Sequence, residues 1–200
     1  MRSVPRQARS QAKVARILDA AESVLLDEGF DALTSKRIAV VAGVPIGTVY
    51  QFFADKSGVV DALARRYLAE FEAVMVDLVE ESSRAHWSDL VDIVFDAFAD
   101  HYRARPGYVA LWLGRHLSPE IQLADDANNE LLALGLRAII AGQEGLPEDD
   151  ELLRSCRVGI HLGDAMLQLA FRTTPGGDPR IMTEAKRLER LYLTEFVTRG

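Results

Sequence analysis

Apolar residues recur along this chain three and four residues apart, which is the spacing of an amphipathic helix and not of a strand. The first apolar stripe runs over residues 14–25 and stops before Gly29, a residue type that commonly ends helices. Thr34 is a typical N-cap residue for a short helix over residues 35–42. Gly43 is expected to end that helix.

The rest of the chain continues the same pattern. Pro45 suits the first position of another short helix, which is expected to run to about residue 53. Asp55 or Ser57 then begins a long helix that extends to about residue 82. Proline and glycine residues separate the later stripes, which predict helices over residues 87–104, 106–117, 119–141, 148–172 and 179–198. The fold class is therefore expected to be all-α.

Composition places the chain in an ordinary globular class. It has 200 residues, of which 48% are hydrophobic and 26% are charged, so one or two domains with a sizeable core are expected. The single cysteine, Cys156, excludes an intrachain disulfide. No apolar run approaches the roughly 20 residues of a membrane span, and the basic N-terminus lacks an apolar signal-peptide core. We expect a cytoplasmic protein with no membrane partner.

The net charge of −7 conceals an asymmetry between the two ends of the chain. Residues 1–66 contain 10 Lys or Arg against 7 Asp or Glu, whereas residues 67–200 contain 13 against 23. Residues 1–18 contain no acid, and their basic residues are Arg2, Arg6, Arg9, Lys13 and Arg16. This arm indicates an end that faces phosphates, although a solvated tail would have the same composition.

Enzymatic and metal-binding signatures are lacking. The chain has no Gly-x-Ser-x-Gly, no phosphate-binding Gly-x-x-x-x-Gly-Lys and no His-Glu-x-x-His. None of its four histidines pairs with an acid at metal-ligand spacing, so no catalytic residue, metal or cofactor is predicted. His161 is interpreted as a core histidine and Cys156 as inert packing within an apolar helix.

The two short helices over residues 34–42 and 45–53, joined by a turn with glycine, have the proportions of a helix-turn-helix. A purely structural helix hairpin would have the same shape. Short hydroxyls and helix N-terminal amides can bind phosphate oxygens, and Gly47 leaves room for close approach to a groove. The polar face expected to point outward consists of Thr34, Ser35, Lys36, Gly47, Thr48, Tyr50 and Gln51, with Lys56 just beyond the second helix.

Residues 17–63, "ILDAAESVLLDEGFDALTSKRIAVVAGVPIGTVYQFFADKSGVVDAL", resemble the DNA-binding domain of the tetracycline-repressor (TetR) family of bacterial transcription regulators. The matching elements are Ala20-Ala21, Gly29-Phe30, Thr34 before Ile38-Ala39, Ala42-Gly43-Val44, Gly47-Thr48-Val49-Tyr50, and Phe53 followed by Lys56. The resemblance implies that phosphates are contacted by Thr34, Tyr50 and Lys56, that Thr48 lies near phosphate and base, and that base edges are faced by Lys36, Ile46, Gly47 and Gln51.

Two positions depart from common members of this family. Ile46 stands where a polar residue is frequent, and Phe52 stands where histidine is frequent. Ile46 could contact a thymine methyl group, and Gln51 could pair with an adenine edge. Phe52 and Phe53 are interpreted as packing the helix pair against the long fourth helix.

The last two predicted helices resemble, in place and order, the pair through which this family forms a four-helix dimer interface. The helix over residues 148–172 is apolar nearly all round. A monomer could also cover these stripes internally. The dimer-interface candidates are Gly159, Gly163, Leu167, Ile181, Ala185, Leu188 and Tyr192.

Family members typically bind a small effector among their middle helices. By helix order and residue type, the candidate lining here is Phe71, Met75, Phe98, Tyr102, Tyr108, Trp112, His116 and Met166. Aromatic residues at helical spacing are also ordinary core, so packing is the alternative for each of them. Trp112 and His116, one turn apart, are the best aromatic and polar pair in this region.

The sequence therefore predicts a helix-turn-helix DNA-binding domain over residues 1–54 and a helical effector-binding and dimerisation domain over residues 55–200. The predicted function is sequence-specific transcription regulation by a homodimer, most readily a repressor that leaves double-stranded operator DNA when an unidentified small-molecule effector binds. The alternative is a ligand-binding or catalytic helical protein in which the helix-turn-helix is only structural.

Overall fold

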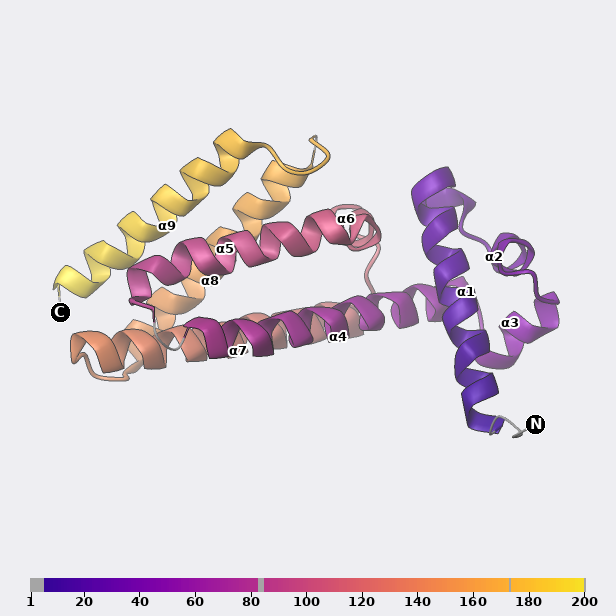
Figure 1. Cartoon of the computed structure of the whole chain (residues 1–200), viewed down its shortest axis with the longest axis horizontal. Coiled ribbons are helices and arrows are strands. Elements are labelled where there is room, and N and C mark those ends of the chain that lie inside the picture. Colours follow the sequence, from indigo (N-terminus) through magenta and orange to yellow (C-terminus); the bar gives the residue numbers. More distant parts are fainter. Residues whose placement is uncertain (1–5, 83–84, 173, 200) are drawn as a thin grey trace. The chain divides into compact units, whose positions relative to one another are not determined.

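The computed structural model describes the backbone of residues 6–82, 85–172 and 174–199, and the side chains of residues 7–73, 85–172 and 174–198. Over these residues it contains nine α-helices, one short 3-10 helix and no strand (Figure 1), so the all-α prediction is confirmed. The elements are α1 Arg6–Glu28, η1 Phe30–Ala32, α2 Ser35–Ala42, α3 Ile46–Phe52, α4 Lys56–Ser82, α5 Trp87–Ala104, α6 Pro106–Leu113, α7 Pro119–Glu144, α8 Asp150–Phe171 and α9 Pro179–Arg199.

The chain folds into two compact units. The first unit comprises residues 1–67 and 106–121, and the second comprises residues 68–105 and 122–200. The sequence pattern placed a domain boundary between residues 54 and 55, inside a continuous stretch of the first unit. It also gave no sign that α6, which is distant in sequence, packs with α1.

The first unit is built on an apolar core shared by α1, α2, α3 and the start of α4. Ile17, Ile38, Val49 and Leu63 are fully buried there. These residues come from the apolar faces that the sequence pattern indicated. Burying such faces provides most of the stability of short helices, which are marginal in isolation.

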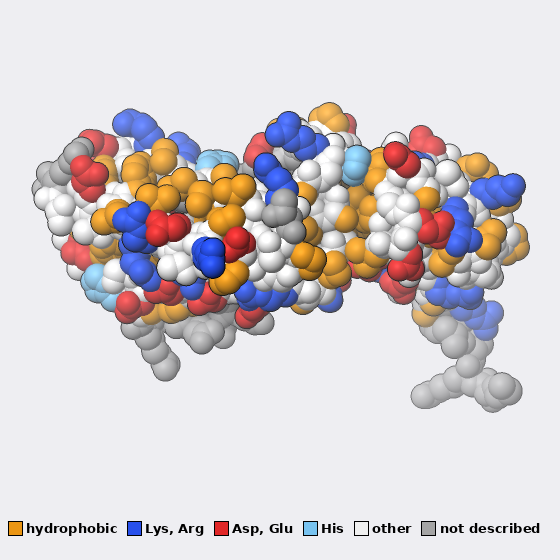
Figure 2. All heavy atoms as spheres, turned by 90° about the horizontal axis from the view of Figure 1, so that it is seen from above, with side chains coloured by type: hydrophobic (Ala, Val, Ile, Leu, Met, Phe, Trp, Pro, Cys, Tyr) orange, Lys and Arg blue, Asp and Glu red, His pale blue; other side chains and the backbone are white. Residues whose placement is uncertain are grey.

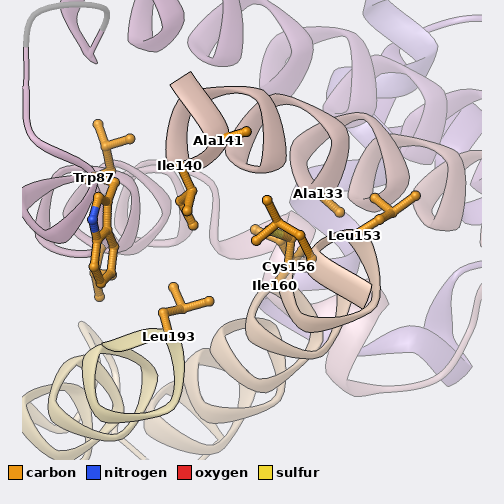
Figure 3. Close-up of a cluster of buried hydrophobic side chains, with 11 residues drawn as sticks. Trp87, Ala133, Ile140, Ala141, Leu153, Cys156, Ile160 and Leu193 are labelled. Atoms are coloured by element: carbon orange, nitrogen blue, oxygen red, sulfur yellow. The ribbon is translucent and has the colours of Figure 1, made fainter. Parts of the chain in front are cut away.

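The second unit contains a hydrophobic cluster that α5, α7, α8 and α9 share (Figure 3). Its members include Trp87 of α5, Ile140 of α7, Cys156 of α8 and Leu193 of α9. Burial raises the pKa of the Cys156 thiol to about 11, which keeps it protonated and unreactive at neutral pH. This agrees with its interpretation as inert packing.

Two predicted positions were wrong. The helix that begins at Pro106 ends at Leu113 and not near residue 117, because Arg115 adopts a left-handed conformation with φ 55°. His161 is exposed on α8 and is not a core histidine. Its neighbours in the sequence are apolar, but the helix directs this position outward.

Candidate functional site

The helix pair α2 and α3 is fixed by local hydrogen bonds that the sequence encodes. Thr34 Oγ1 accepts a bond from the Arg37 amide at 3.1 Å, which caps α2. Gly43 closes the same helix with φ 61°, and the Val44 amide donates to the Ala39 carbonyl at 3.0 Å. Pro45 is the N-cap of α3 and not its first residue, so the helix begins at Ile46, one residue later than the sequence pattern predicted.

One face of α3 is open to solvent and combines apolar and polar groups. Ile46, Gly47, Tyr50 and Gln51 are all exposed, and their spacing places them on the same side of the helix, opposite the fully buried Val49. Tyr50 is 54% exposed. A Cβ built at Gly47 would meet nothing within 4 Å, so this glycine leaves a smooth surface for an external partner.

Other residues predicted to contact DNA lie at the start of α2 and within α3. Thr34 and Lys36 are exposed, whereas Ser35 and Thr48 are half-buried. The Thr34 hydroxyl already accepts the capping bond, but its own proton remains available to a phosphate oxygen. The surface formed by residues 34–36 and 46–51 is called the α2–α3 surface below.

Lys56 is held in place by Phe30 and does not extend freely into solvent. Its Nζ atom donates to the Phe30 carbonyl at 2.9 Å and lies 3.9 Å from the centre of the Phe30 ring. The His116 ring stacks on the same phenyl ring at 3.5 Å with an interplanar angle of 4°. His116, an effector candidate, therefore packs against the loop that precedes α2.

The basic N-terminal residues are only partly described. Arg9, Lys13 and Arg16 are exposed on α1, while the side chains of Arg2 and Arg6 lie outside the described residues. Arg16 donates to the Ala42 carbonyl at 2.6 Å, so it supports the C-terminal end of α2. This role was not apparent in the sequence.

Polar bonds join α1 and α4 inside the first unit, and α6 packs closely against them. The Tyr67 hydroxyl donates to Glu22 Oε1 at 2.6 Å, and Arg66 forms ion pairs with Glu22 and Asp19 at 2.7 and 2.6 Å. Burial, followed by the nearby Glu22 carboxylate, raises the pKa of Tyr67 far above its ordinary range. Gly107 of α6 lies directly over the Tyr67 hydroxyl, where a Cβ would be only 2.0 Å away.

The remaining effector candidates separate into the two units. Tyr108 and Trp112 stack on each other at 3.9 Å in the first unit. In the second unit, Phe71 stacks on Phe98 at 4.8 Å, and the Tyr102 ring meets Phe171 edge-on at 5.0 Å. Met166 is half-buried, and the Met75 side chain lies outside the described residues.

Four of the seven dimer-interface candidates are buried within a single chain. Gly159 packs against Leu193, and Gly163 lies against the Glu189 side chain, so both glycines let α9 approach α8. Leu167 and Ala185 are each 1% exposed. Within one chain these four residues are therefore buried in the packing of α8 and α9, and their role at a subunit interface stays a prediction.

The exposed apolar residues of α8 and α9 are different ones. Leu188 is 39% exposed and Leu191 of the same helix is 54% exposed, while Ile181 and Tyr192 are half-buried. Val158 and Leu169 add exposed apolar area on α8. Figure 2 shows hydrophobic side chains gathered among charged ones on the unit that contains α8 and α9.

Comparisons with known proteins identify the family. The family model described as "Bacterial regulatory proteins, tetR family" matches residues 17–63, and the model described as "Tetracyclin repressor-like, C-terminal domain" matches residues 85–197. The chain belongs to the TetR family. Members of this family are transcription regulators and not enzymes, which agrees with the absence of catalytic signatures in the sequence.

Two individual relatives match over most of the chain, and a third matches over a shorter part of it. A TetR-family transcriptional regulator from Streptomyces coelicolor is 34% identical, with 92% of this chain and 98% of that chain covered and a TM-score of 0.65. The transcriptional regulator BetI 2 of Chromohalobacter salexigens is 25% identical over 92% of this chain and 87% of its own length. An uncharacterized regulator, YvkB of Bacillus subtilis, is 35% identical over 39% of each chain.

The fold alone extends to more distant TetR structures. The fatty acid degradation regulator FadR from Bacillus halodurans is 16% identical, with 96% of this chain and 97% of that chain covered and a TM-score of 0.69.

Among the described residues no helix is long and apolar enough to cross a membrane. No group of three or more potential metal ligands occurs in the described part of the chain either.

Sequence reasoning overlooked residues that this TetR-family structure brings to notice. Asp164 and Gln168 are polar residues in the largely apolar second half of α8, and this pattern was a detectable signal of a half-buried polar site. Leu191 and Val158 carry exposed apolar surface, but the dimer-interface candidates predicted from the sequence did not include them. The Phe30–His116 stack joins distant segments and has no local signal at all.

Proposed function

We propose that this TetR-family regulator binds operator DNA through the α2–α3 surface as a homodimer, and that a small-molecule effector in the second unit controls this binding. The observation that carries the proposal is the exposed face of α3, where Ile46, Gly47, Tyr50 and Gln51 lie together above a buried Val49. A helix of this kind fits the major groove, where side chains can reach base edges.

The roles on this surface follow from chemistry and position. Thr34 and Tyr50 offer hydroxyl protons to phosphate oxygens, and the half-buried Thr48 lies in the first turn of α3. Lys56, fixed by Phe30, offers its two remaining N–H groups to the backbone. Gln51 and Lys36 face base edges, and Ile46 suits a thymine methyl group.

A charge-neutral substitution at Lys56 tests the DNA-binding proposal. Lys56→Gln keeps a long side chain that can donate to Phe30 but removes the positive charge. The slope of log K for operator binding against log salt concentration should become shallower by about 2, because each phosphate contact contributes about 0.9 to this slope and a dimer loses two contacts. The measurement is fluorescence anisotropy over a salt titration, with DNA that flanks the gene.

The matched control is Arg154→Ala, which removes one positive charge from an exposed position on α8. It should leave the salt dependence unchanged. Gln51→Ala should instead alter the preference among operator sequences without changing the salt slope. If wild-type protein binds none of the flanking DNA, the proposal of operator binding through the α2–α3 surface is wrong.

The dimer is proposed to form through the exposed apolar residues of α8 and α9. A stable interface usually buries more than about 1,000 Å² with an apolar centre, and Val158, Leu169, Leu188 and Leu191 provide such a centre. Two half-sites on successive major-groove turns then require two recognition helices.

Leu191→Glu should weaken dimerisation by about a hundredfold or more, because a charge would be buried at the contact. Sedimentation equilibrium at micromolar concentration measures the change. Leu26→Glu introduces the same charge at an exposed leucine of α1 and serves as the control. A wild-type protein that is already monomeric would contradict the proposed interface and the recognition of paired half-sites.

The effector is proposed to bind beside Phe71, Phe98, Tyr102 and Met166 in the second unit. Aromatic rings with remaining exposure, such as the half-buried Phe98, are typical of sites for small organic molecules. Tyr108, Trp112 and His116 are accounted for by packing in the first unit, so the proposal no longer includes them.

A further inference from the structure

A half-buried carboxylate of the second unit, Asp164, lies within hydrogen-bond distance of an aromatic residue of α5. Asp164 of α8 is half-buried and accepts a hydrogen bond from Gln168 Nε2 at 2.8 Å and another from the Tyr102 hydroxyl at 3.5 Å. Among the described side chains, no lysine or arginine forms an ion pair with it. Its partial exposure means that a molecule from solvent can reach it.

Two carboxylates of α5 in the same unit do have cationic partners. Asp92 and Asp96 of α5 are paired with Lys186 and Arg190 of α9. Asp164, by contrast, lies on a helix that is otherwise mostly apolar, and burial raises the pKa of its carboxyl even though Gln168 and the nearby His161 oppose the shift. An enclosed carboxylate without a positive partner is costly, and a bound cation would remove that cost.

Aromatic rings extend from this carboxylate along α5. The Tyr102 ring, whose hydroxyl reaches Asp164, packs edge-on against Phe171 at 5.0 Å. Phe98 lies one helical turn before Tyr102 and stacks on Phe71 of α4 at 4.8 Å. The faces of aromatic rings carry negative electrostatic potential and attract organic cations.

We propose that the effector of this regulator is an organic cation, an ammonium joined to an apolar group, with its charge held by Asp164 and its apolar part against Tyr102, Phe98 and Phe71. The inference rests on the proposed effector site and names the class of ligand for it. A carboxylate supplies the charge partner, while the rings supply both apolar contact and cation–π attraction.

Three probes of nearly the same shape and different charge test the class of ligand. They are 4-phenylbutylammonium, 4-phenylbutanol and 4-phenylbutyrate, titrated calorimetrically into the full-length protein at neutral pH. The ammonium should bind about tenfold or more tighter than the alcohol, because a hydrogen bond between oppositely charged groups is stronger than one with a neutral hydroxyl. The anion should bind most weakly, because the Asp164 carboxylate repels it.

Asp164→Asn keeps the shape of the side chain and removes the charge, and it should abolish the preference for the ammonium while leaving alcohol binding unchanged. Asp126→Asn, at an exposed position of α7, should keep the preference. Equal binding of the three probes, no binding of the ammonium, or a preference that survives in Asp164→Asn would each overturn the inference.

Operator binding separates this inference from the proposed function. If the ammonium binds with the expected preference and releases operator DNA, both stand. If neutral or anionic compounds release the DNA while the ammonium does not bind, effector control stands and the cation site fails. If the ammonium binds through Asp164 without changing DNA affinity, the cation site stands as a ligand site and its role in effector control fails.

Discussion

Replacing Gly107 with alanine is expected to lower the free energy of unfolding by about 2–4 kcal/mol, since the new methyl group has no space in a filled core. A Cβ at this position would lie 2.0 Å from the Tyr67 hydroxyl and 2.9 Å from Glu22 Oε1. Tyr67 is fully buried and its hydroxyl is bonded to Glu22, so the ring cannot move aside without breaking that bond. The bond between α1 and α4 would be strained as α6 is forced away.

Chemical denaturation at fixed protein concentration measures the effect of Gly107→Ala. Gly135→Ala is the control, since this helical glycine of α7 is exposed and a Cβ there meets nothing within 4 Å. The control should raise the free energy of unfolding by about 0.5–1 kcal/mol through the lower entropy of the unfolded chain. Adding Tyr67→Phe to Gly107→Ala should restore part of the lost stability. Equal stability of Gly107→Ala and wild type would contradict the close packing described for α6.

Helix ends that depend on a local capping signal could be predicted from the sequence. Thr34 and Gly43 bound α2 in the structure as expected, because a side-chain cap and a left-handed glycine act within one helical turn. Gly29, with φ 83°, separates α1 from the 3-10 turn for the same reason. The end of α6 was missed because Arg115 adopts a left-handed conformation without being glycine or asparagine.

Which side of a helix meets which partner could not be predicted in the same way. Small residues such as Gly159 and Gly163 permit close helix approach, but the pattern is identical whether the approaching helix belongs to the same chain or to another. In the structure they face Leu193 and Glu189 of α9. The face of α3 was easier to predict, because a short helix with one buried residue, Val49, leaves only one arrangement of its exposed positions.

The candidate effector residues show the same distinction between local and long-range information. Phe98 and Tyr102, one turn apart on α5, could be assigned to a common side of the second unit from spacing alone. The pairing of His116 with Phe30 could not, since His116 lies 86 positions further along the chain and no local pattern links the two residues. Long-range packing therefore determined which of the aromatic residues remained candidates for the effector site.

Wild-type protein is expected to lose stability as the pH rises from about 4.5 to about 7, relative to a Glu189→Gln variant. Burial against α8, where the Glu189 carboxylate lies over Gly163, raises the pKa of this group to about 7. Below pH 4.5 the group is protonated in both the folded and the unfolded chain, so it imposes no cost. Between these values the unfolded chain ionises first, and the free energy of unfolding falls.

Raising this pKa from 4.5 to about 7 corresponds to about 3 kcal/mol of lost stability once the pH exceeds 7. Glutamine at position 189 stays neutral, so the variant should be more stable than wild type at pH 8 by up to that amount and nearly equal to it at pH 4. Denaturant unfolding at several pH values gives the free energy of unfolding of both proteins. The contributions of all other titrating groups cancel in the difference between them.

Glu184→Gln on the exposed side of the same helix is the matched control, because it removes a carboxylate that pairs with Arg187 near the surface. Its stability should follow that of wild type at every pH within about 0.5 kcal/mol. The neighbouring cations cannot neutralise Glu189, since Lys186 and Arg190 are directed to Asp92 of α5. A Glu189→Gln variant whose stability relative to wild type does not change with pH would show that the carboxylate is solvated in the folded protein.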